Sequence, residues 1–367
     1  MTTLDGYRSE ADALDARILR AIALPAQFGE AAFGSLARDL FAHQVRWNTP
    51  YAAYARARGY GTDRLPATLD QIPAVPAAAF KETVLSTVGE TRAALWFETS
   101  GTSHGRAGRQ YLESTLLYDA ALLAGFDAAL LADGKALRYV LLVPNPHAHP
   151  HSSLGYMMAQ VAARRGDSRT TWFLNDGVLD VAGFTVALDE ARDDGQAVCI
   201  ATTAFALVAL LDELEARGRR FALPQGSRIM ETGGFKGRTR VVTREELYPR
   251  AAALLGVPLE AIVAEYGMTE LSSQYYDSHA SRATLDRRKA WPAWLRPIVV
   301  DAQGRPVAPG VVGAIRHIDL ANRSSVLAIE TEDLGALVDG ELVLIGRERG
   351  ADLRGCSLDA EDLAARA

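Results

Sequence analysis

The chain has 367 residues, of which 49% are hydrophobic and 23% are charged, and its formal net charge is -6 at pH 7. This length allows two or three domains with large cores, and an acidic balance without a long basic block argues against a nucleic-acid partner. Two cysteines are too few for a disulfide framework, and neither a signal-peptide pattern nor an apolar run of about 20 residues is present, so we expect a cytoplasmic protein without a membrane span.

The first 70 residues are predicted to form a helical segment, because residues 5–60 are rich in Ala, Arg and Leu. Residues 71–296 alternate apolar, strand-like runs with amphipathic runs, which predicts a layered α/β domain with a mostly parallel sheet. Its strands are expected at Ala94–Phe97, Tyr139–Val143, Thr171–Leu174, Ala197–Ala201, Arg228–Glu231 and Ala261–Glu265. Its helices are expected near 111–132, 152–165, 179–194, 202–217 and 243–255.

The pattern changes from about residue 297, where short strands punctuated by Gly and Pro follow one another. This pattern predicts a smaller β-rich subdomain over residues 297–346. The expected strands are Ile298–Asp301, Gly313–Asp319, Val326–Glu330 and Leu342–Ile345. Residues 347–367 form a polar C-terminal tail.

The stretch from Glu98 to Arg109 is the most informative one in the chain. An apolar run breaks into hydroxyls, glycines and arginines and is followed by an amphipathic segment, and a strand, turn and helix in this order form a phosphate-binding layout. The spacing of a Walker loop is absent, and an ordinary solvated loop is the alternative. The candidate phosphate-binding residues are Thr99, Ser100, Gly101, Thr102, Ser103, Gly105, Arg106 and Arg109.

Two further polar turns follow predicted strands, where ligands bind in open α/β sheets. The first turn is Tyr266-Gly267-Met268-Thr269-Glu270, directly after the strand that ends at Glu265. Tyr266 offers a stacking face, Thr269 offers a hydroxyl, and Glu270 offers a hard oxygen for Mg²⁺. The second turn is glycine-rich and basic. Its candidate residues are Gly233, Gly234 and Lys236.

Three features near the C-terminus complete the set of candidates. Asp333 is expected in a turn between two strands, where a carboxylate could accept hydrogen bonds from ribose hydroxyls, and Arg347 closes the next strand. The residues alone favour the alternative, a simple acidic turn without a ligand. Cys356 lies in a polar stretch among arginines, which lower the pKa of a thiol, whereas Cys199 fits an inert core position.

His147, His149 and His151 alternate in a proline-rich loop that fits a pocket lining better than a metal site.

Together these stretches resemble the acyl-adenylate-forming enzymes over roughly residues 70–360. In that superfamily, a Thr-Ser-Gly-Thr loop handles the phosphates of ATP, as Thr99–Thr102 would here. A Tyr-Gly-x-Thr-Glu motif corresponds to Tyr266–Glu270, an Asp that holds the ribose corresponds to Asp333, and a Gly-Arg at the hinge corresponds to Gly346–Arg347. The resemblance implies ATP and Mg²⁺ as cofactors.

Two departures narrow the resemblance. The usual lysine of the phosphate loop is missing, and the sequence stops before the C-terminal lid of about 100 residues. A lid-less chain with a Cys near its end resembles the fatty acyl-protein synthetases of bacterial bioluminescence and their non-luminous relatives. That branch implies a fatty acid substrate, acyl transfer to Cys356 and delivery to a reductase partner. The lid-less aryl-acid adenylating enzymes of phenazine biosynthesis are a second similar branch.

Three functions stay open at this point. The first is a ligase that acylates itself at Cys356. The second is an adenylating enzyme that passes an aryl or acyl group to CoA or a carrier protein, and the third is a non-catalytic, nucleotide-binding subunit of a reductase complex. The sequence leaves open the acyl chain, the final acceptor, the oligomeric state (a homo-oligomer included) and any link to light emission.

Overall fold

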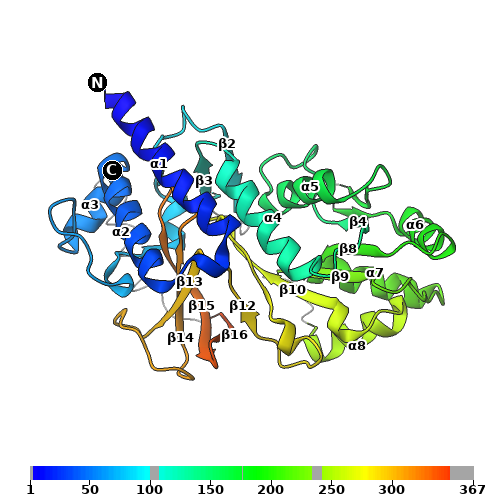
Figure 1. Ribbon diagram of the computed structural model, residues 1–367. Helices are drawn as coiled ribbons and strands as arrows, with labels where there is room; N and C mark the ends of the chain where they lie inside the picture. The colour runs from blue at the N-terminus through cyan, green and yellow to red at the C-terminus, as the bar shows by residue number, and fades with distance from the viewer. Residues whose placement is uncertain (1–2, 100–106, 176, 234–241, 348–367) are drawn as a thin grey trace. The chain divides into compact units, whose positions relative to one another are not determined.

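The computed structural model describes residues 3–99, 107–175, 177–233 and 242–347, and the chain divides into two compact units (Figure 1). Unit 1 comprises residues 1–124, 268–273 and 291–367, and unit 2 comprises residues 125–267 and 274–290. The expected division of the chain into a helical segment, an α/β core, a β-rich subdomain and a tail, with boundaries at residues 70, 296 and 346, stays a prediction.

Unit 1 begins with three helices, which lie within the segment predicted to be helical. They are α1 (Thr3–Ala23), α2 (Glu30–Trp47) and α3 (Thr49–Ala57). In α2, Phe33, Leu36 and Leu40 repeat every three or four residues and are buried, as are Ala37 and Phe41 beside them, so one face of the helix packs into the core. Asn48 begins α3, because its side chain accepts a hydrogen bond from the amide of Tyr51.

The strands at the C-terminal end of unit 1 form an antiparallel meander, where the sequence predicts a β-rich stretch. They are β13 (Leu295–Val300), β14 (Gly313–Asp319), β15 (Ala328–Val338) and β16 (Glu341–Arg347), and β1 (Val75–Pro76) pairs in parallel with β15. The turn expected at residues 330–335 is wrong, because β15 continues through Asp333. Within the strand, Thr331 is buried between Glu330 and the exposed Glu332. The chain turns at Asp339 and Gly340, which both have positive φ.

A two-stranded hairpin in unit 1 replaces the expected strand-to-helix turn. Strand β2 (Leu95–Glu98) pairs in antiparallel fashion with β3 (Arg109–Leu112), and α4 (Leu116–Leu130) begins only later. The predicted helix start at residue 111 is wrong, because Gln110, Tyr111 and Leu112 are buried as strand residues. The loop between residues 99 and 108 therefore connects two strands, and no helix N-terminus follows it directly.

Unit 2 is built on a sheet in which five parallel strands are followed by two antiparallel ones, in the order β5-β4-β8-β9-β10-β11-β12. The parallel strands are β5 (Thr171–Trp172), β4 (Arg138–Leu142), β8 (Val198–Thr203), β9 (Arg228–Thr232) and β10 (Ile262–Tyr266). The antiparallel strands are β11 (Tyr275–Asp277) and β12 (Lys289–Ala290), and β6 (Leu174–Asn175) pairs with β7 (Val178–Leu179) as a separate hairpin. The predicted mostly parallel sheet is confirmed.

The helices of unit 2 follow the predicted ranges closely. They are α5 (Ser153–Arg165), α6 (Val181–Asp193), α7 (Ala204–Ala216) and α8 (Arg244–Leu255). The side chains of Ser152, Asp180 and Thr203 each accept a backbone hydrogen bond at the start of α5, α6 and α7. Apolar residues of α6, α7 and α8 share one buried cluster with those of β4, β8, β9 and β10. None of the helices in the described part of the chain combines the length and apolar character needed to cross a bilayer.

Candidate functional site

The candidate phosphate loop is closed at its base by Thr99. Its amide donates a hydrogen bond to the carbonyl of Gly108 at 2.9 Å, and its hydroxyl oxygen accepts one from the amide of Gly108 at 2.9 Å. On β3, Arg109 forms an ion pair with Glu98 of β2, with Nε 2.9 Å from Oε1. The other predicted residues of this loop (Ser100, Gly101, Thr102, Ser103, Gly105 and Arg106) lie outside the described residues.

Thr269 and Glu270 occupy the corner of a tight turn in unit 1. The amide of Leu271 donates to the carbonyl of Met268 at 3.1 Å, which closes a four-residue turn with Thr269 and Glu270 at its centre. The hydroxyl of Thr269 donates to the carbonyl of Glu98 at 3.4 Å. The structure therefore brings the Thr269–Glu270 turn to the end of β2, where the candidate phosphate loop begins.

Two buried amides hold the backbone carbonyl of Glu270. Gln110 Nε2 donates to this oxygen at 3.0 Å and Asn322 Nδ2 donates to it at 2.9 Å. Gln110 Nε2 also donates to Asn322 Oδ1 at 3.0 Å. The turn is thereby joined both to β3 and to the connection between β14 and β15.

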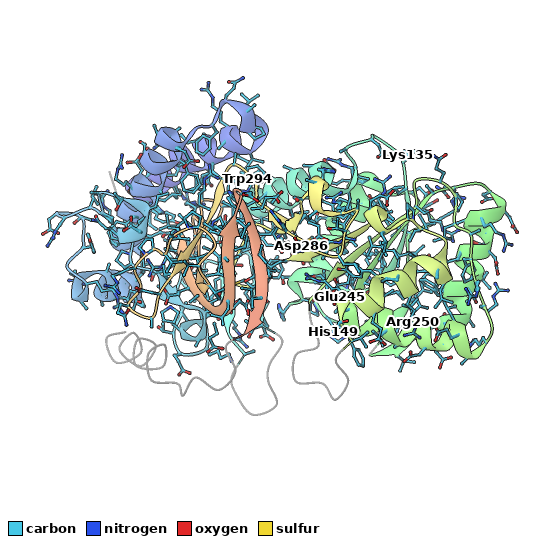
Figure 2. The ribbon with its side chains drawn as sticks, turned by 90° about the horizontal axis from the view of Figure 1, so that it is seen from below. Lys135, His149, Glu245, Arg250, Asp286 and Trp294 are labelled. Atoms are coloured by element: carbon cyan, nitrogen blue, oxygen red, sulfur yellow. The ribbon has the colours of Figure 1, made fainter. Side chains whose placement is uncertain are left out.

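The residues after the turn are held by Asp319, at the end of β14. Its Oδ2 accepts hydrogen bonds from the amides of Ser272 and Ser273 at 3.0 and 2.9 Å, and its Oδ1 accepts from the Ser273 hydroxyl and the Ala321 amide at 2.8 and 3.0 Å. Trp294, labelled in Figure 2, donates from Nε1 to Ser273 Oγ at 3.0 Å. Burial raises the pKa of Asp319 to about 6, although the four hydrogen bonds favour its charged form.

In unit 2, two of the predicted site residues, Gly233 and Gly267, lie directly after β9 and β10 at positions where a residue with a Cβ would be strained. Gly233 has a φ of 79°, which favours glycine over every residue with a Cβ. A Cβ on Gly267 would collide with Oε1 of Glu265, whose Oε2 accepts a hydrogen bond from Thr232. Tyr266 ends β10 with its ring 5.6 Å from that of Tyr275. The predicted Gly234 and Lys236 lie outside the described residues.

Buried charges support these two strand ends from within unit 2. Lys289 Nζ donates to Asp277 Oδ1 at 2.8 Å and to the Ala264 carbonyl on β10 at 2.7 Å. On β9, Glu231 accepts a hydrogen bond from Tyr248 at 3.0 Å, and burial raises the pKa of its carboxyl. The hydrogen bonds offset the desolvation of these groups and fix the backbone from which the polar turns emerge.

Asp333 lies on β15 opposite Arg347 of β16. Its backbone amide donates to Thr331 Oγ1 at 3.3 Å. The charge of Asp333 favours the protonated form of His317, yet burial dominates and lowers the pKa of this histidine to about 4. Because Asp333 lies on a paired strand, its backbone is more fixed than it would be in the expected turn.

The structure describes one of the two cysteines and all three of the alternating histidines. Cys199 is fully buried on β8, and burial raises the pKa of its thiol to about 12, which confirms an inert core position. Cys356 lies outside the described residues. His147 and His149 are exposed, and no group of three or more His, Cys, Asp or Glu side chains forms a metal site within the described ranges.

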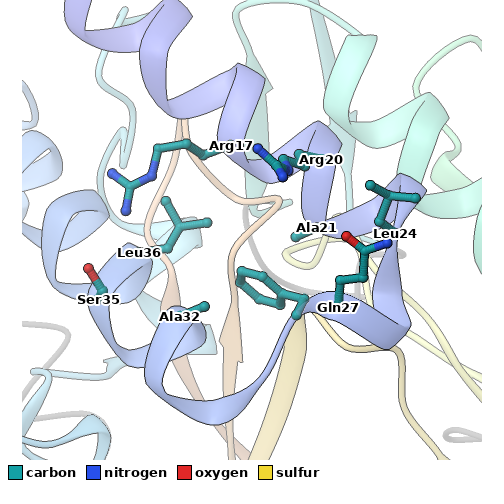
Figure 3. A pocket seen from close by; sticks show the side chains of 9 residues that line it. Arg17, Arg20, Ala21, Leu24, Gln27, Ala32, Ser35 and Leu36 are labelled. Carbon is teal, nitrogen blue, oxygen red and sulfur yellow. The ribbon is translucent and has the colours of Figure 1, made fainter.

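A hollow of about 370 Å³ lies between α1 and α2, with Arg17, Arg20, Leu24, Phe28 and Leu36 among its lining residues (Figure 3). None of the predicted site residues lines it. The sequence analysis also missed Gln110, Asn322 and Asp319, which hold the Thr269–Glu270 turn. Their one sequence signal is a polar residue inside or directly after an apolar strand pattern.

Three solved structures resemble the fold at low sequence identity. McyG A-PCP complexed with phenylalanyl-adenylate is 18% identical, with 71% of this chain and 48% of that chain covered at a TM-score of 0.51. ATP-bound MatB from Rhodopseudomonas palustris is 14% identical (70% and 48% covered, TM-score 0.51), and the long-chain-fatty-acid–CoA ligase FadD1 from Archaeoglobus fulgidus is 15% identical (70% and 51% covered, TM-score 0.50). The chain spans about half the length of each.

No curated protein matches the chain. The family model of the acyl-protein synthetases named LuxE matches residues 19–363, nearly the whole length of the chain. This range includes the β2–β3 hairpin, the Thr269–Glu270 turn, strand β15 and position 356. The chain belongs to the LuxE family of acyl-protein synthetases.

Proposed function

We propose that this protein activates a carboxylic acid, most simply a fatty acid, with ATP to give an acyl-adenylate, and then transfers the acyl group to Cys356 for delivery to a reductase partner. The observation that carries this proposal is the family match over residues 19–363. It includes every residue to which the sequence assigns a role in nucleotide binding or acyl transfer.

The described residues of unit 1 support the activation step. The loop that Thr99 closes would bind the phosphates through backbone amides and hydroxyls, and Thr269 and Glu270 are hydrogen-bonded to Glu98 and Gln110 at the loop end of the same hairpin. Asp333 would accept hydrogen bonds from the ribose hydroxyls, and Arg347 would lie opposite it on β16. Arg109 would add positive charge beside the loop, tempered by its ion pair with Glu98.

In unit 2, the residues at the ends of β9 and β10 suit a nucleotide base and a phosphate. Tyr266 offers an aromatic face, and Gly267 after it has no Cβ, which leaves room for the Glu265 carboxylate. The turn of Gly233, Gly234 and Lys236 would add backbone donors and a cation.

Glu270 is the residue that we expect to hold Mg²⁺. Its carboxylate is the kind of hard oxygen that Mg²⁺ prefers, and a Mg²⁺ here would take its remaining ligands from phosphate oxygens and water. When bound, the ion neutralises charge that develops on the departing pyrophosphate. The turn positions Glu270 before any ligand arrives, because side chains from β3 and from the β14–β15 connection hold its carbonyl.

The two chemical steps balance as follows. A carboxylate oxygen of the acid attacks the α-phosphorus of ATP, the bond from this phosphorus to the bridging oxygen breaks, and pyrophosphate leaves. The Cys356 thiolate then attacks the acyl carbonyl, a thioester forms, and AMP leaves with the former carboxylate oxygen. The thiol proton goes to solvent or to a base.

Intact-mass measurement after incubation with ATP, Mg²⁺ and a panel of fatty and aryl acids tests the proposal. We expect a gain of one acyl mass that neutral hydroxylamine removes, since thioesters are cleaved under these conditions. Cys356→Ser should lose this label and keep carboxylate-dependent ATP–pyrophosphate exchange, whereas Cys199→Ser, the matched control, should label normally because Cys199 is buried. Exchange without any protein label would instead favour transfer to CoA or a carrier protein, and the absence of exchange would reject activation itself.

A further inference from the structure

Within the described part of the chain, the buried side-chain amide of Gln110 is hydrogen-bonded through its nitrogen but not through its oxygen. Its side chain is fully buried on β3, and Nε2 donates to both the Glu270 carbonyl and Asn322 Oδ1 at 3.0 Å. Its Oε1 has no hydrogen-bond partner among the described residues. A buried amide oxygen without a partner destabilises the folded state, so the stability of the fold does not by itself explain a glutamine at this position.

The placement of Gln110 suggests what its nitrogen does. The residue follows Gly108, which closes the candidate phosphate loop, by two positions. On the other strand of the hairpin, the carbonyl of Glu98 accepts a hydrogen bond from the Thr269 hydroxyl. Both strands of the hairpin are therefore hydrogen-bonded to the turn: β2 is bonded to Thr269, and β3 is bonded to Glu270.

We propose that Gln110 is a positioning residue, which fixes the Glu270 turn against the β2–β3 hairpin and so sets the position of the Mg²⁺ ligand relative to Thr99 and Gly108, the paired residues at the ends of β2 and β3. This inference rests on the proposed function, because it takes Glu270 as that ligand. Asn322 shares the task from the other side, where its Nδ2 donates to the same carbonyl and to the carbonyl of Val326 at 3.1 Å.

The expected effect is on chemistry more than on folding. A displacement of about 1 Å in a group that positions a reacting centre can reduce a rate about 100-fold. Gln110→Met keeps the length and approximate volume of the side chain and removes both of its hydrogen bonds. It also removes the oxygen without a partner, which limits the loss of stability.

The matched control is Tyr51→Phe. The Tyr51 hydroxyl is buried in the same unit and donates to the carbonyl of Pro73 at 2.9 Å, so this change also removes one buried donor from a backbone carbonyl. It does not touch the turn. A purely structural role for Gln110 predicts that the two variants behave alike once their unfolding free energies are taken into account.

The experiment compares the parent protein with Gln110→Met, Tyr51→Phe, Glu270→Gln and the double variant Gln110→Met/Glu270→Gln. The first readout is the Mg²⁺ concentration that half-saturates ATP–pyrophosphate exchange, and the second is the affinity for Mn²⁺ in the presence of ATP, measured by electron paramagnetic resonance. We expect Gln110→Met to lower exchange by about tenfold or more and to weaken both metal readouts, with Tyr51→Phe close to the parent. In the Glu270→Gln background, Gln110→Met should change little further, because the two residues act as one unit.

Two results overturn the inference in distinguishable ways. If Glu270→Gln weakens the metal readouts and Gln110→Met does not, Gln110 has no positioning role although the proposed function stands. If Glu270→Gln leaves both metal readouts at the parent values, the assignment of Glu270 itself fails. Gln110→Asn, which keeps an amide but shortens the side chain by one methylene, provides the same comparison if Gln110→Met does not fold.

Discussion

Asp319 offers the sharpest test of how the Thr269–Glu270 turn is built. In Asp319→Asn, the amide oxygen can still accept from the amides of Ser272 and Ser273, but the new NH₂ group faces the amide of Ala321, which is a donor. One buried donor then lacks a partner, and this destabilises the folded state by about 1–3 kcal/mol. The opposing effect is the removal of a buried charge.

The pH dependence separates these two effects. Burial raises the pKa of Asp319 from 3.8 to about 6, so the folded state binds this proton more tightly than the unfolded state. The stability of the parent therefore falls as pH rises from about 4 to about 6, and at about 1.36 kcal/mol per pH unit the difference amounts to about 3 kcal/mol. Asparagine does not titrate. Relative to Asp319→Asn, the parent should thus lose about 3 kcal/mol between pH 4 and pH 7.

Urea denaturation of both proteins at several pH values measures this difference, and ATP–pyrophosphate exchange at pH 7 measures the effect on the site. At pH 7 the two effects on stability nearly cancel, so we expect the variant to fold. We also expect its exchange to be reduced about tenfold or more, because repulsion between the new NH₂ group and the Ala321 amide displaces the side chain and, with it, the bonded amides of Ser272 and Ser273. Parallel stability curves for parent and variant would refute the raised pKa, and full exchange activity would refute a role for Asp319 in holding the turn.

Three further predictions concern residues of the described strands. Asp333→Ala should raise the KM for ATP, with a smaller effect when the nucleotide is dideoxy-ATP; an equal effect on both nucleotides would place Asp333 away from the ribose. Burial lowers the pKa of His317 to about 4, so the unfolding free energy of the parent falls as pH falls from 6.5 to about 4. Chemical denaturation should show the unfolding free energy of His317→Gln gaining on the order of 3 kcal/mol relative to the parent in this range. A constant difference between the two proteins would contradict this. Thr269→Val should lower exchange activity with little loss of stability, since its hydroxyl makes one long hydrogen bond of 3.4 Å; a fully active variant would show that the hydroxyl has no role.

The sequence was sufficient to predict the layered architecture, because the signals that carry it are local. The apolar runs of β4, β8, β9 and β10 and the helices between them follow the expected alternation, and β14 has the predicted bounds. The two errors arose where a local signal pointed the wrong way. At Tyr111 the amphipathic pattern begins within a strand, and at residues 330–335 the acidic residues belong to the middle strand of a meander.

The candidate site was predictable only in part, for a related reason. Motif residues such as Thr99 and Glu270 follow apolar runs, so a sequence pattern indicates them. The residues that hold them do so over long separations: Gln110 binds the Glu270 carbonyl across 160 positions, and Asp319 binds Ser273 across 46. A buried polar side chain has no periodicity of its own, and its partner is set by the folded topology.

The same contacts explain why the N-terminal helices are part of this unit. Gln44 of α2 donates from Nε2 to the carbonyl of Asn322 at 2.8 Å, and Arg323 forms a bidentate ion pair with Asp15 of α1, with distances of 2.7 and 3.0 Å. Asn322 in turn holds the Glu270 carbonyl. Buried and bidentate pairs of this kind fix geometry as well as contributing energy. The helices therefore reach the candidate site through one connection between β14 and β15, and the position of Glu270 depends on the folding of segments more than 200 residues apart in the sequence.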